Sequence, residues 1–210
     1  VIAEGKLKPK AIIAVDLFGL PADYPALRKI ADKYDLKIIE DAAQGFGGEI
    51  NGKRAGSFGD IATLSFYPAH HITMGEGGAV FMNNPELKII AESYRDWGRD
   101  CYCKPGCDDT CGKRFGQKLG SLPQGYDHKY TYSHLGYNLK ITDMQAACGL
   151  DQLEKLEFFI QRRRENFAYL RRSLEPLREF LDLPFATPNS NPSWFGFPLT
   201  IRPAAGVSRV

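Results

Sequence analysis

The sequence lacks a long hydrophobic run and a strong excess of charge. No stretch of about 18 consecutive apolar residues occurs, so we expect no membrane-spanning helix. With 27 Lys and Arg against 25 Asp and Glu, the formal net charge is only +2, which gives no reason to expect binding to nucleic acid or to an acidic membrane. No signal peptide is visible, and the first residue is Val1 rather than methionine. We therefore expect a fragment of a longer chain, located in the cytoplasm.

Cysteine is scarce but strongly clustered. Of five cysteines, four lie within eleven residues, at Cys101, Cys103, Cys107 and Cys111. Thiols stay reduced in the cytoplasm, so a cluster of this kind indicates a metal site rather than a set of disulfides.

A strand–helix–strand unit is expected near the N-terminus. Residues 10–15 form a short apolar run that is typical of a buried strand. Asp23 can cap a helix over residues 24–34, with Leu27, Ile30, Ala31 and Tyr34 on one face. Residues 36–39 give the next strand. Such a βαβ unit predicts a parallel sheet covered by helices.

The residues that follow the predicted strands are candidates for a ligand site. Glu40 and Asp41 close the second strand, and ligands gather at the carboxyl ends of strands in open parallel sheets. Further strands are expected at residues 61–66 and 79–82, and a helix at residues 85–94.

The second half of the chain combines a long loop with a long helix. Residues 98–137 are loop-like, and so long an irregular segment is usually functional or disordered. The Thr-Asp-Met-Gln sequence at 142–145 is a capping box. The helix that it starts should carry a core-facing apolar stripe of Leu153, Leu156, Ile160, Phe167, Leu170 and Leu174, and a solvated face bearing the arginines at 162–164 and 171–172. We expect one domain over residues 1–175 and the start of a smaller one over residues 176–210.

Three segments together resemble the DegT/StrS group, the sugar aminotransferase family of PLP (pyridoxal phosphate) fold type I. They are Glu-Asp-Ala-Ala-Gln-Gly at 40–45, Gly-Ser-Phe-Gly-Asp at 56–60 running into Ser-Phe-Tyr-Pro at 65–68, and Leu-Gly-Tyr-Asn at 135–138 followed by the capping box. Their order and spacing match over nearly the whole chain. The resemblance implies a three-layer α/β/α fold with a mostly parallel sheet. The chain would hold part of the large cofactor-binding domain and the start of the small C-terminal one.

His70 stands where this family carries its essential lysine. An imidazole has no primary amine and cannot form a Schiff base with PLP, but it can move protons near neutral pH. His70, His71 and the segment from Arg95 to His134 resemble the branch of CDP-4-keto-6-deoxyglucose 3-dehydrases. This resemblance implies removal of the C3 hydroxyl from a nucleotide-linked 4-keto-6-deoxyhexose, in 3,6-dideoxysugar and lipopolysaccharide O-antigen biosynthesis. It also implies pyridoxamine phosphate (PMP), an iron–sulfur cluster and a separate flavin reductase as electron donor.

The resemblance assigns roles to five residues. Asp41 would pair with the pyridinium nitrogen and keep the ring a good electron sink. Gln44 would lie near the ring hydroxyl, and Ser65 would contact the cofactor phosphate. Asn138 would reach a phosphate in the partner subunit of a homodimer. His70 would be the general base that takes a proton from the methylene carbon of the cofactor.

The cysteine cluster leaves three alternatives open. Cys101, Cys103 and Cys111 match three ligands of the iron–sulfur branch, but Ala43 stands where its remaining cysteine is expected. Cys107 is then the candidate for a fourth thiolate of a 2Fe–2S cluster. The other two alternatives are a tetrahedral zinc site and no metal at all.

The Asp-Ala-Ala-Gln sequence at 41–44 is the form found in ordinary sugar aminotransferases. It supports a second hypothesis, a PLP-dependent nucleotide-sugar aminotransferase or a relative without a cluster. A third hypothesis is a truncated, inactive domain.

Overall fold

The computed structural model describes residues 5–104 and 106–206, which divide into two compact units. The first unit combines the residues up to Met82 with those from Asp143 onward, and the second is Asn83–Thr142. The expected division between residues 175 and 176 stays a prediction.

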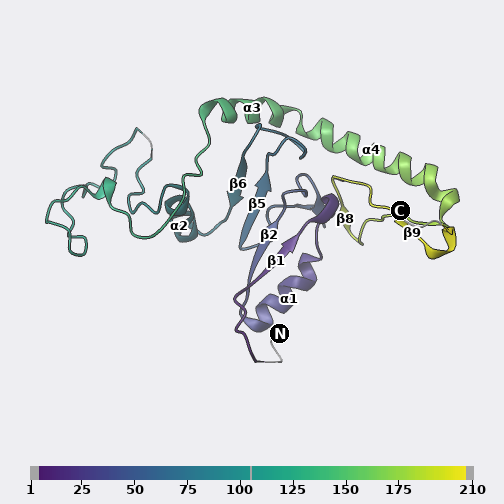
Figure 1. Ribbon diagram of the computed structural model, residues 1–210, viewed down its shortest axis with the longest axis horizontal. Coiled ribbons are helices and arrows are strands. Elements are labelled where there is room, and N and C mark those ends of the chain that lie inside the picture. The colour runs from purple at the N-terminus through teal and green to yellow at the C-terminus, as the bar shows by residue number, and fades with distance from the viewer. Residues whose placement is uncertain (1–4, 105, 207–210) are drawn as a thin grey trace. The chain divides into compact units, whose positions relative to one another are not determined.

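The first unit is built on a four-stranded sheet of the order β1-β2-β5-β6 (Figure 1). Strands β1 (Ala11–Val15), β2 (Lys37–Asp41) and β5 (Ile61–Ser65) are parallel, whereas β6 (Gly78–Phe81) runs antiparallel to β5. The mostly parallel sheet and the βαβ unit are thereby confirmed.

Helix α1 (Tyr24–Tyr34) covers one face of this sheet. Its N-cap is Asp23, as predicted, whose side chain accepts a hydrogen bond from the Ala26 N–H at 3.1 Å. The core beneath the helix contains Ala31 and Ile38, both fully buried. The predicted apolar face is only half right, because Ile30 and Tyr34 are more than 40% exposed.

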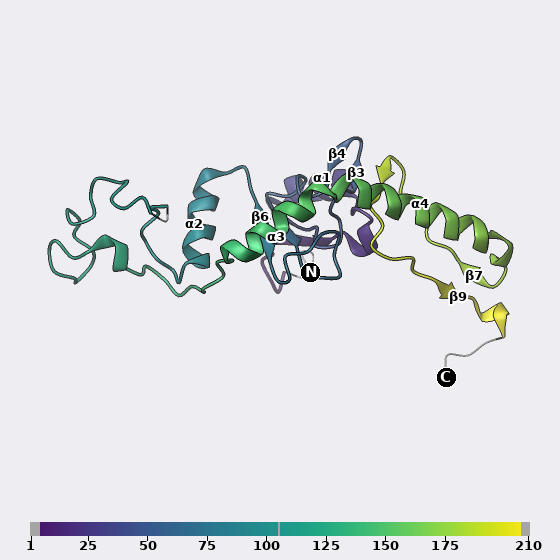
Figure 2. The same ribbon diagram turned by 90° about the horizontal axis from the view of Figure 1, so that it is seen from above.

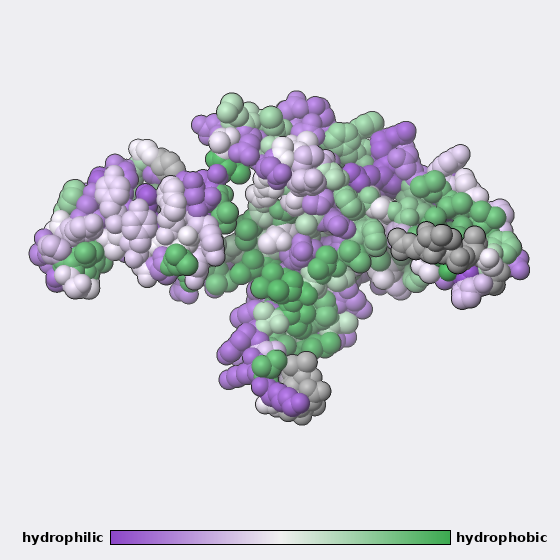
Figure 3. Space-filling view, in the orientation of Figure 1, coloured by the Kyte–Doolittle hydropathy of each residue, from purple (hydrophilic) through white to green (hydrophobic). Residues whose placement is uncertain are grey.

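The opposite face of the sheet is apolar and open. Ile13 and Val15 of β1 are 68% and 47% exposed, and Val80 of β6 is 56% exposed. Figure 3 shows hydrophobic side chains gathered over this part of the first unit. Two of the three predicted layers, the sheet and α1, lie within the described residues.

The predicted long helix is interrupted. Helix α3 (Asp143–Glu154) ends before Lys155 and α4 (Leu156–Leu174) follows it, nearly end to end in Figures 1 and 2. Part of the predicted stripe is buried, since Leu156 and Ile160 pack against Ile72, Phe46 and Phe66. Leu153 and Leu170 are instead 49% and 40% exposed. The short 3₁₀ segment η3 (Glu175–Leu177) contains Pro176 and ends the helical region.

Residues beyond α4 return to the N-terminal part of the first unit. Strand β8 (Ser190–Asn191) pairs with β3 (Glu49–Ile50), which also pairs with β4 (Lys53–Arg54). Strands β7 (Leu181–Asp182) and β9 (Thr200–Ile201) form a separate antiparallel pair, followed by the 3₁₀ segment η4 (Pro203–Ala205).

Three of the arginines on α4 bind the returning segment, and Arg171 among them donates to the Pro184 carbonyl. Arg164 donates to the carbonyl oxygens of Gly47, Asn191 and Pro192 at 3.0–3.1 Å, and Arg163 donates to that of Trp194 at 3.1 Å. The prediction of a solvated arginine face is therefore wrong for Arg163, Arg164 and Arg171, which are only partly exposed.

The second unit is helix α2 (Pro85–Arg95), capped by Asn84, followed by a long loop with one 3₁₀ segment, η2 (His128–Tyr130). Its loop character agrees with the prediction for residues 98–137. Among the described residues, every helix is too short or too polar to cross a membrane.

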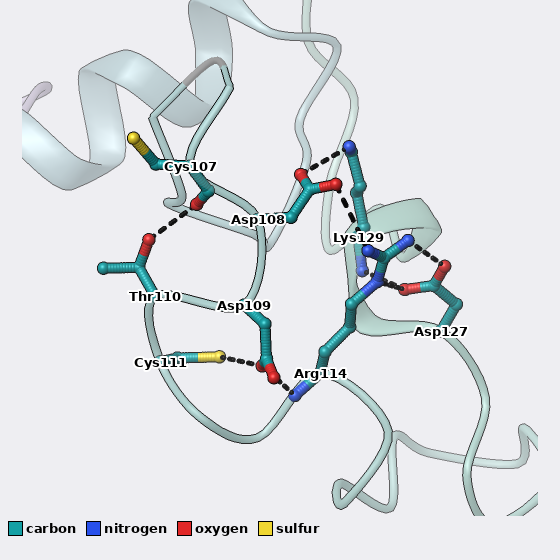
Figure 4. A network of polar contacts seen from close by, with 8 residues as sticks. All are labelled: Cys107, Asp108, Asp109, Thr110, Cys111, Arg114, Asp127 and Lys129. Carbon is teal, nitrogen blue, oxygen red and sulfur yellow. Dashed lines mark hydrogen bonds and ion pairs between the residues drawn. The ribbon is translucent and has the colours of Figure 1, made fainter.

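Polar contacts hold this loop together (Figure 4). The Arg114 guanidinium donates twice to Asp127 at 2.8 Å and once to Asp108 at 3.3 Å. Lys129 donates to the other oxygen of Asp108 at 2.7 Å.

Candidate active site

Polar side chains meet at the carboxyl ends of the parallel strands of the first unit. Asp16 follows β1, Asp41 is the last residue of β2, and Ser65 is the last of β5. The Asp41 carboxylate accepts hydrogen bonds from the Ala43 N–H at 3.1 Å and the Thr63 hydroxyl at 3.4 Å. These contacts fix Asp41 at the carboxyl end of the parallel strands, where ligands of such folds bind.

His70 lies in the loop between β5 and β6. Its ring contacts the rings of Tyr67 and Phe195, with centroid distances of 6.0 and 5.4 Å, and its buried Nδ1 has no hydrogen-bond partner among the described residues. Burial lowers the pKa of His70, the Asp41 carboxylate raises it, and the Arg163 guanidinium lowers it, with a net decrease. The imidazole is therefore mostly neutral at pH 7, the form that a base requires.

A groove of about 500 Å³ opens beside His70. Its lining includes His71, Thr73, Gln152, Arg162 and Arg163. This volume falls within the range of small-molecule sites in proteins. The groove joins the imidazole of His70 with the cationic groups of Arg162 and Arg163, and the Asp41 carboxylate acts on His70 from the end of β2.

Gln44 and Ser65 are both held near the sheet edge. The Gln44 Oε1 accepts a hydrogen bond from the Phe18 N–H at 2.9 Å. The Ser65 hydroxyl oxygen accepts one from the Tyr67 N–H at 3.2 Å. The structure thus brings four of the predicted residues, Asp41, Gln44, Ser65 and His70, into one unit, and their roles toward a cofactor stay predictions.

Asp16 is a buried carboxyl group that the sequence analysis does not single out. It is fully buried, and its Oδ1 accepts from the Tyr24 hydroxyl at 2.8 Å and the Ala22 N–H at 3.0 Å. Its Oδ2 has no hydrogen-bond partner in the described part of the chain. Burial raises the pKa of Asp16 to about 7, and the charges of Glu40 and Asp41 act in the same direction. Its position directly after a strand, like that of Asp41, was the available signal.

Replacing Asp16 by asparagine should change how stability depends on pH. In the unfolded chain the Asp16 carboxyl ionises near pH 3.8, whereas in the folded chain it keeps its proton up to about pH 7. Between pH 4 and pH 7 the folded state therefore holds a proton on Asp16 that the unfolded state has lost. The free energy of unfolding falls by about 4 kcal/mol as the pH rises through this range. Urea unfolding of both proteins at pH 5 and pH 8 should show the variant gaining stability relative to the native protein at the higher pH. Equal differences at the two values would contradict this assignment.

Three of the four clustered cysteines come together in the second unit. Cys101, Cys103 and Cys111 line one small pocket, together with the buried imidazole of His128. Burial raises the pKa of the Cys101 thiol, whereas a hydrogen bond with the Thr110 side chain lowers that of Cys103.

Cys107 does not join this group. It is exposed, and Figure 4 shows its sulfur pointing away from the polar network, while the Cys111 sulfur points to Asp109 at 4.0 Å. Over residues 5–104 and 106–206, no three or more His, Cys, Asp or Glu side chains are placed to hold a metal ion. The donor set present does not fit a cluster held by four thiolates of this chain.

Asn138 lies in the second unit, where it is exposed and forms a β-bridge with Asp96. Its role toward the phosphate of a partner subunit stays a prediction.

The sequence reasoning missed residues 193–195 altogether. The Ser193 carbonyl oxygen lies 2.7 Å from His71 Nε2, and the Phe195 ring contacts His70. These contacts join residues more than 120 positions apart, and no local pattern in residues 193–195 indicates them.

Comparison with known proteins gives close relatives over nearly the whole chain. The lipopolysaccharide biosynthesis protein RfbH of Salmonella typhimurium is 64% identical over 203 residues, which are 97% of this chain and 46% of the relative. The dTDP-4-dehydro-2,6-dideoxy-D-glucose 3-dehydratase of Saccharopolyspora spinosa is 52% identical, over 96% of this chain and 44% of that protein. The chain therefore spans less than half the length of these relatives.

Solved structures support the same grouping. The Escherichia coli GDP-4-keto-6-deoxy-D-mannose-3-dehydratase with bound hydrated PLP matches with a TM-score of 0.79 and 29% identity, over 98% of this chain and 50% of that one. The predicted fold, that of PLP-dependent fold type I enzymes, is confirmed. A model of the DegT/DnrJ/EryC1/StrS aminotransferase family matches residues 2–210. The chain belongs to the DegT/DnrJ/EryC1/StrS aminotransferase family.

Proposed function

We propose that the protein is a PMP-dependent dehydratase that removes the C3 hydroxyl of a nucleotide-linked 4-keto-6-deoxyhexose, in 3,6-dideoxysugar and lipopolysaccharide O-antigen biosynthesis. The observation that carries the proposal is the imidazole of His70 at the position of the family's lysine, close enough to Asp41 at the end of β2 for that carboxylate to act on it. Relatives named for 3-dehydration, at 52% and 29% identity, support it.

The residues of the first unit fit such a cofactor. When bound, PMP supplies an amine for the keto group of the sugar and a ring that accepts electrons. Asp41, held by Ala43 and Thr63, would keep the ring nitrogen protonated. Ser65 would bind the phosphate, and Gln44 would lie beside the ring hydroxyl, while Asn138 would act across a homodimer.

His70 does the proton transfer in this proposal. Its lowered pKa keeps the imidazole unprotonated at neutral pH, so that it can take a proton from the methylene carbon of the cofactor. The absence of a primary amine at position 70 disfavours stable attachment of PLP, and with it ordinary amino transfer.

The electron donor and the location belong to the same proposal. A flavin reductase is proposed as the partner that delivers electrons, in the cytoplasm. Three thiols line one pocket, but the described residues hold no group of three or more side chains placed to bind a metal ion, and Ala43 stands in place of the remaining cysteine. We therefore derive no redox step through a cluster of this chain.

Isotope release tests the proposal. The full-length protein is incubated with PMP and a CDP-linked 4-keto-6-deoxyhexose that carries oxygen-18 at C3. Release of the label into water is expected. Retention of the label with formation of a 4-amino sugar would instead identify an aminotransferase, and retention without any product would identify an inactive relative.

A further inference from the structure

Residues 193–195 lie against both histidines of the β5–β6 loop. His71 Nε2 is 2.7 Å from the Ser193 carbonyl oxygen. The centroid of the Phe195 ring is 5.4 Å from that of His70 and 6.4 Å from that of His71. One aromatic ring therefore contacts the proposed base and its neighbour.

The contact with Ser193 determines the state of His71. A carbonyl oxygen only accepts hydrogen bonds, so His71 Nε2 must carry a proton and donate it. His71 is 3% exposed, and burial lowers its pKa to about 4. At neutral pH it is thus an uncharged ring with the proton on Nε2. That nitrogen is engaged by the backbone and cannot act as a base.

The segment that His71 contacts is held at three successive residues. The Trp194 carbonyl accepts from Arg163 at 3.1 Å, and the Phe195 N–H donates to the Phe18 carbonyl at 2.8 Å. The Trp194 ring also stacks on Phe167 with centroids 3.7 Å apart. With Ser193 held by His71, the backbone that carries the Phe195 ring is fixed beside His70.

Close packing behind Ser193 leaves no room for adjustment. Ser193 is fully buried, and Gly19 has a φ of +84°. A Cβ at position 19 would lie 2.2 Å from the Ser193 oxygen, so only glycine fits there. The Ser193 carbonyl is thereby confined between the His71 ring and the backbone of Gly19.

We propose that His71 is a positioning residue, whose hydrogen bond to the Ser193 carbonyl holds the Phe195 ring against His70 and keeps the general base oriented and its inner side covered. The inference rests on the proposed function in that His70 is the base. The other groups that act on His70 are Asp41 from β2 and Arg163 from α4, with the Tyr67 ring beside it.

Two substitutions at position 71 separate the hydrogen bond from the packing. The amide nitrogen of glutamine reaches about as far as Nε2 of histidine, so His71→Gln should retain the donor to Ser193. His71→Phe keeps an aromatic ring but removes the donor.

NMR titration measures the pKa of the His70 ring, whose signal is assigned by its disappearance in His70→Asn. The pKa should be native-like in His71→Gln. In His71→Phe the pKa should rise toward 6.5, because water reaches the loosened ring. The kcat should fall by about 10²-fold in His71→Phe with KM nearly unchanged, as for a misplaced catalytic group.

A second pair of variants covers failure of His71→Phe to fold. Phe195→Ala should raise the pKa of His70 by hydrating it, and Phe195→Leu, which keeps most of the apolar bulk, should raise it less. A His71→Phe or Phe195→Ala protein that unfolds more easily but titrates at His70 like the native protein would overturn the inference. The titration needs neither cofactor nor sugar, so its result is separate from label release, whose absence would refute the proposed function alone.

Discussion

Replacing His70 by asparagine should lower the rate of oxygen release from C3 by roughly 10²–10⁴-fold, the usual contribution of a general acid–base group. Asparagine has a similar shape but no nitrogen that takes up a proton near neutral pH. Because the groove, Asp41 and Ser65 remain, binding of cofactor and sugar should change little. The loss should thus fall on kcat and not on KM, as measured with the oxygen-18 substrate under saturating conditions.

The pH profile gives an independent test of the same residue. The lowered pKa of His70 keeps the ring neutral to a lower pH than in a free histidine, so kcat/KM of the native protein should fall only below about pH 6.5. This acid limb should be missing from the residual activity of His70→Asn. A variant that retains a tenth or more of the native rate, with the acid limb intact, would assign the base to another group.

Replacing Glu40 by glutamine should lower the free energy of unfolding by about 1–3 kcal/mol, the cost of leaving a buried hydrogen-bond donor without its acceptor. Glu40 is fully buried, and its two oxygens accept hydrogen bonds from the N–H groups of Gly56, Phe58 and Gly59 at 2.5–3.0 Å. The amide of glutamine presents a donor where these N–H groups need an acceptor, so at least one buried N–H loses its partner.

Urea unfolding at pH 7 measures this effect, and Glu157→Gln is its matched control. Glu157 has an exposed side chain and pairs with Arg54 at 3.1 Å, an interaction that contributes at most about 1 kcal/mol. A loss in Glu40→Gln no larger than that in the control would show that the segment from Gly56 to Gly59 is held by other contacts.

Local signals were sufficient for most of the sheet and for α1. The apolar run before Asp16, the Asp23 cap and the strand ending at Asp41 are encoded within a few residues, and each is present as predicted. The exposure of Ile30 and Tyr34 was not predictable in this way, because it depends on how far the sheet extends beneath the helix.

The site was predictable only where its residues follow the strands or match a family motif. Asp41, Ser65 and His70 meet that condition. Phe195 and the half-buried Arg163 do not, since their contacts depend on the return of the chain after α4. The family resemblance already separated Cys101, Cys103 and Cys111 from Cys107, and the folded loop lines one pocket with the same three.

The adjacent carboxylates at the end of β2 point to opposite faces of the sheet, since successive side chains of a strand alternate. Glu40 is sealed in the covered face, and Asp41 lies in line with Val15 and Thr63 on the other. Inserting or deleting a single residue in β2 would exchange the two side chains. Glu40 would then lose the N–H groups of Gly56, Phe58 and Gly59, and Asp41 would point into the core. The pairing register of this strand therefore decides the fold and the chemistry at once, so that a misaligned β2 could not give a stable but inactive protein.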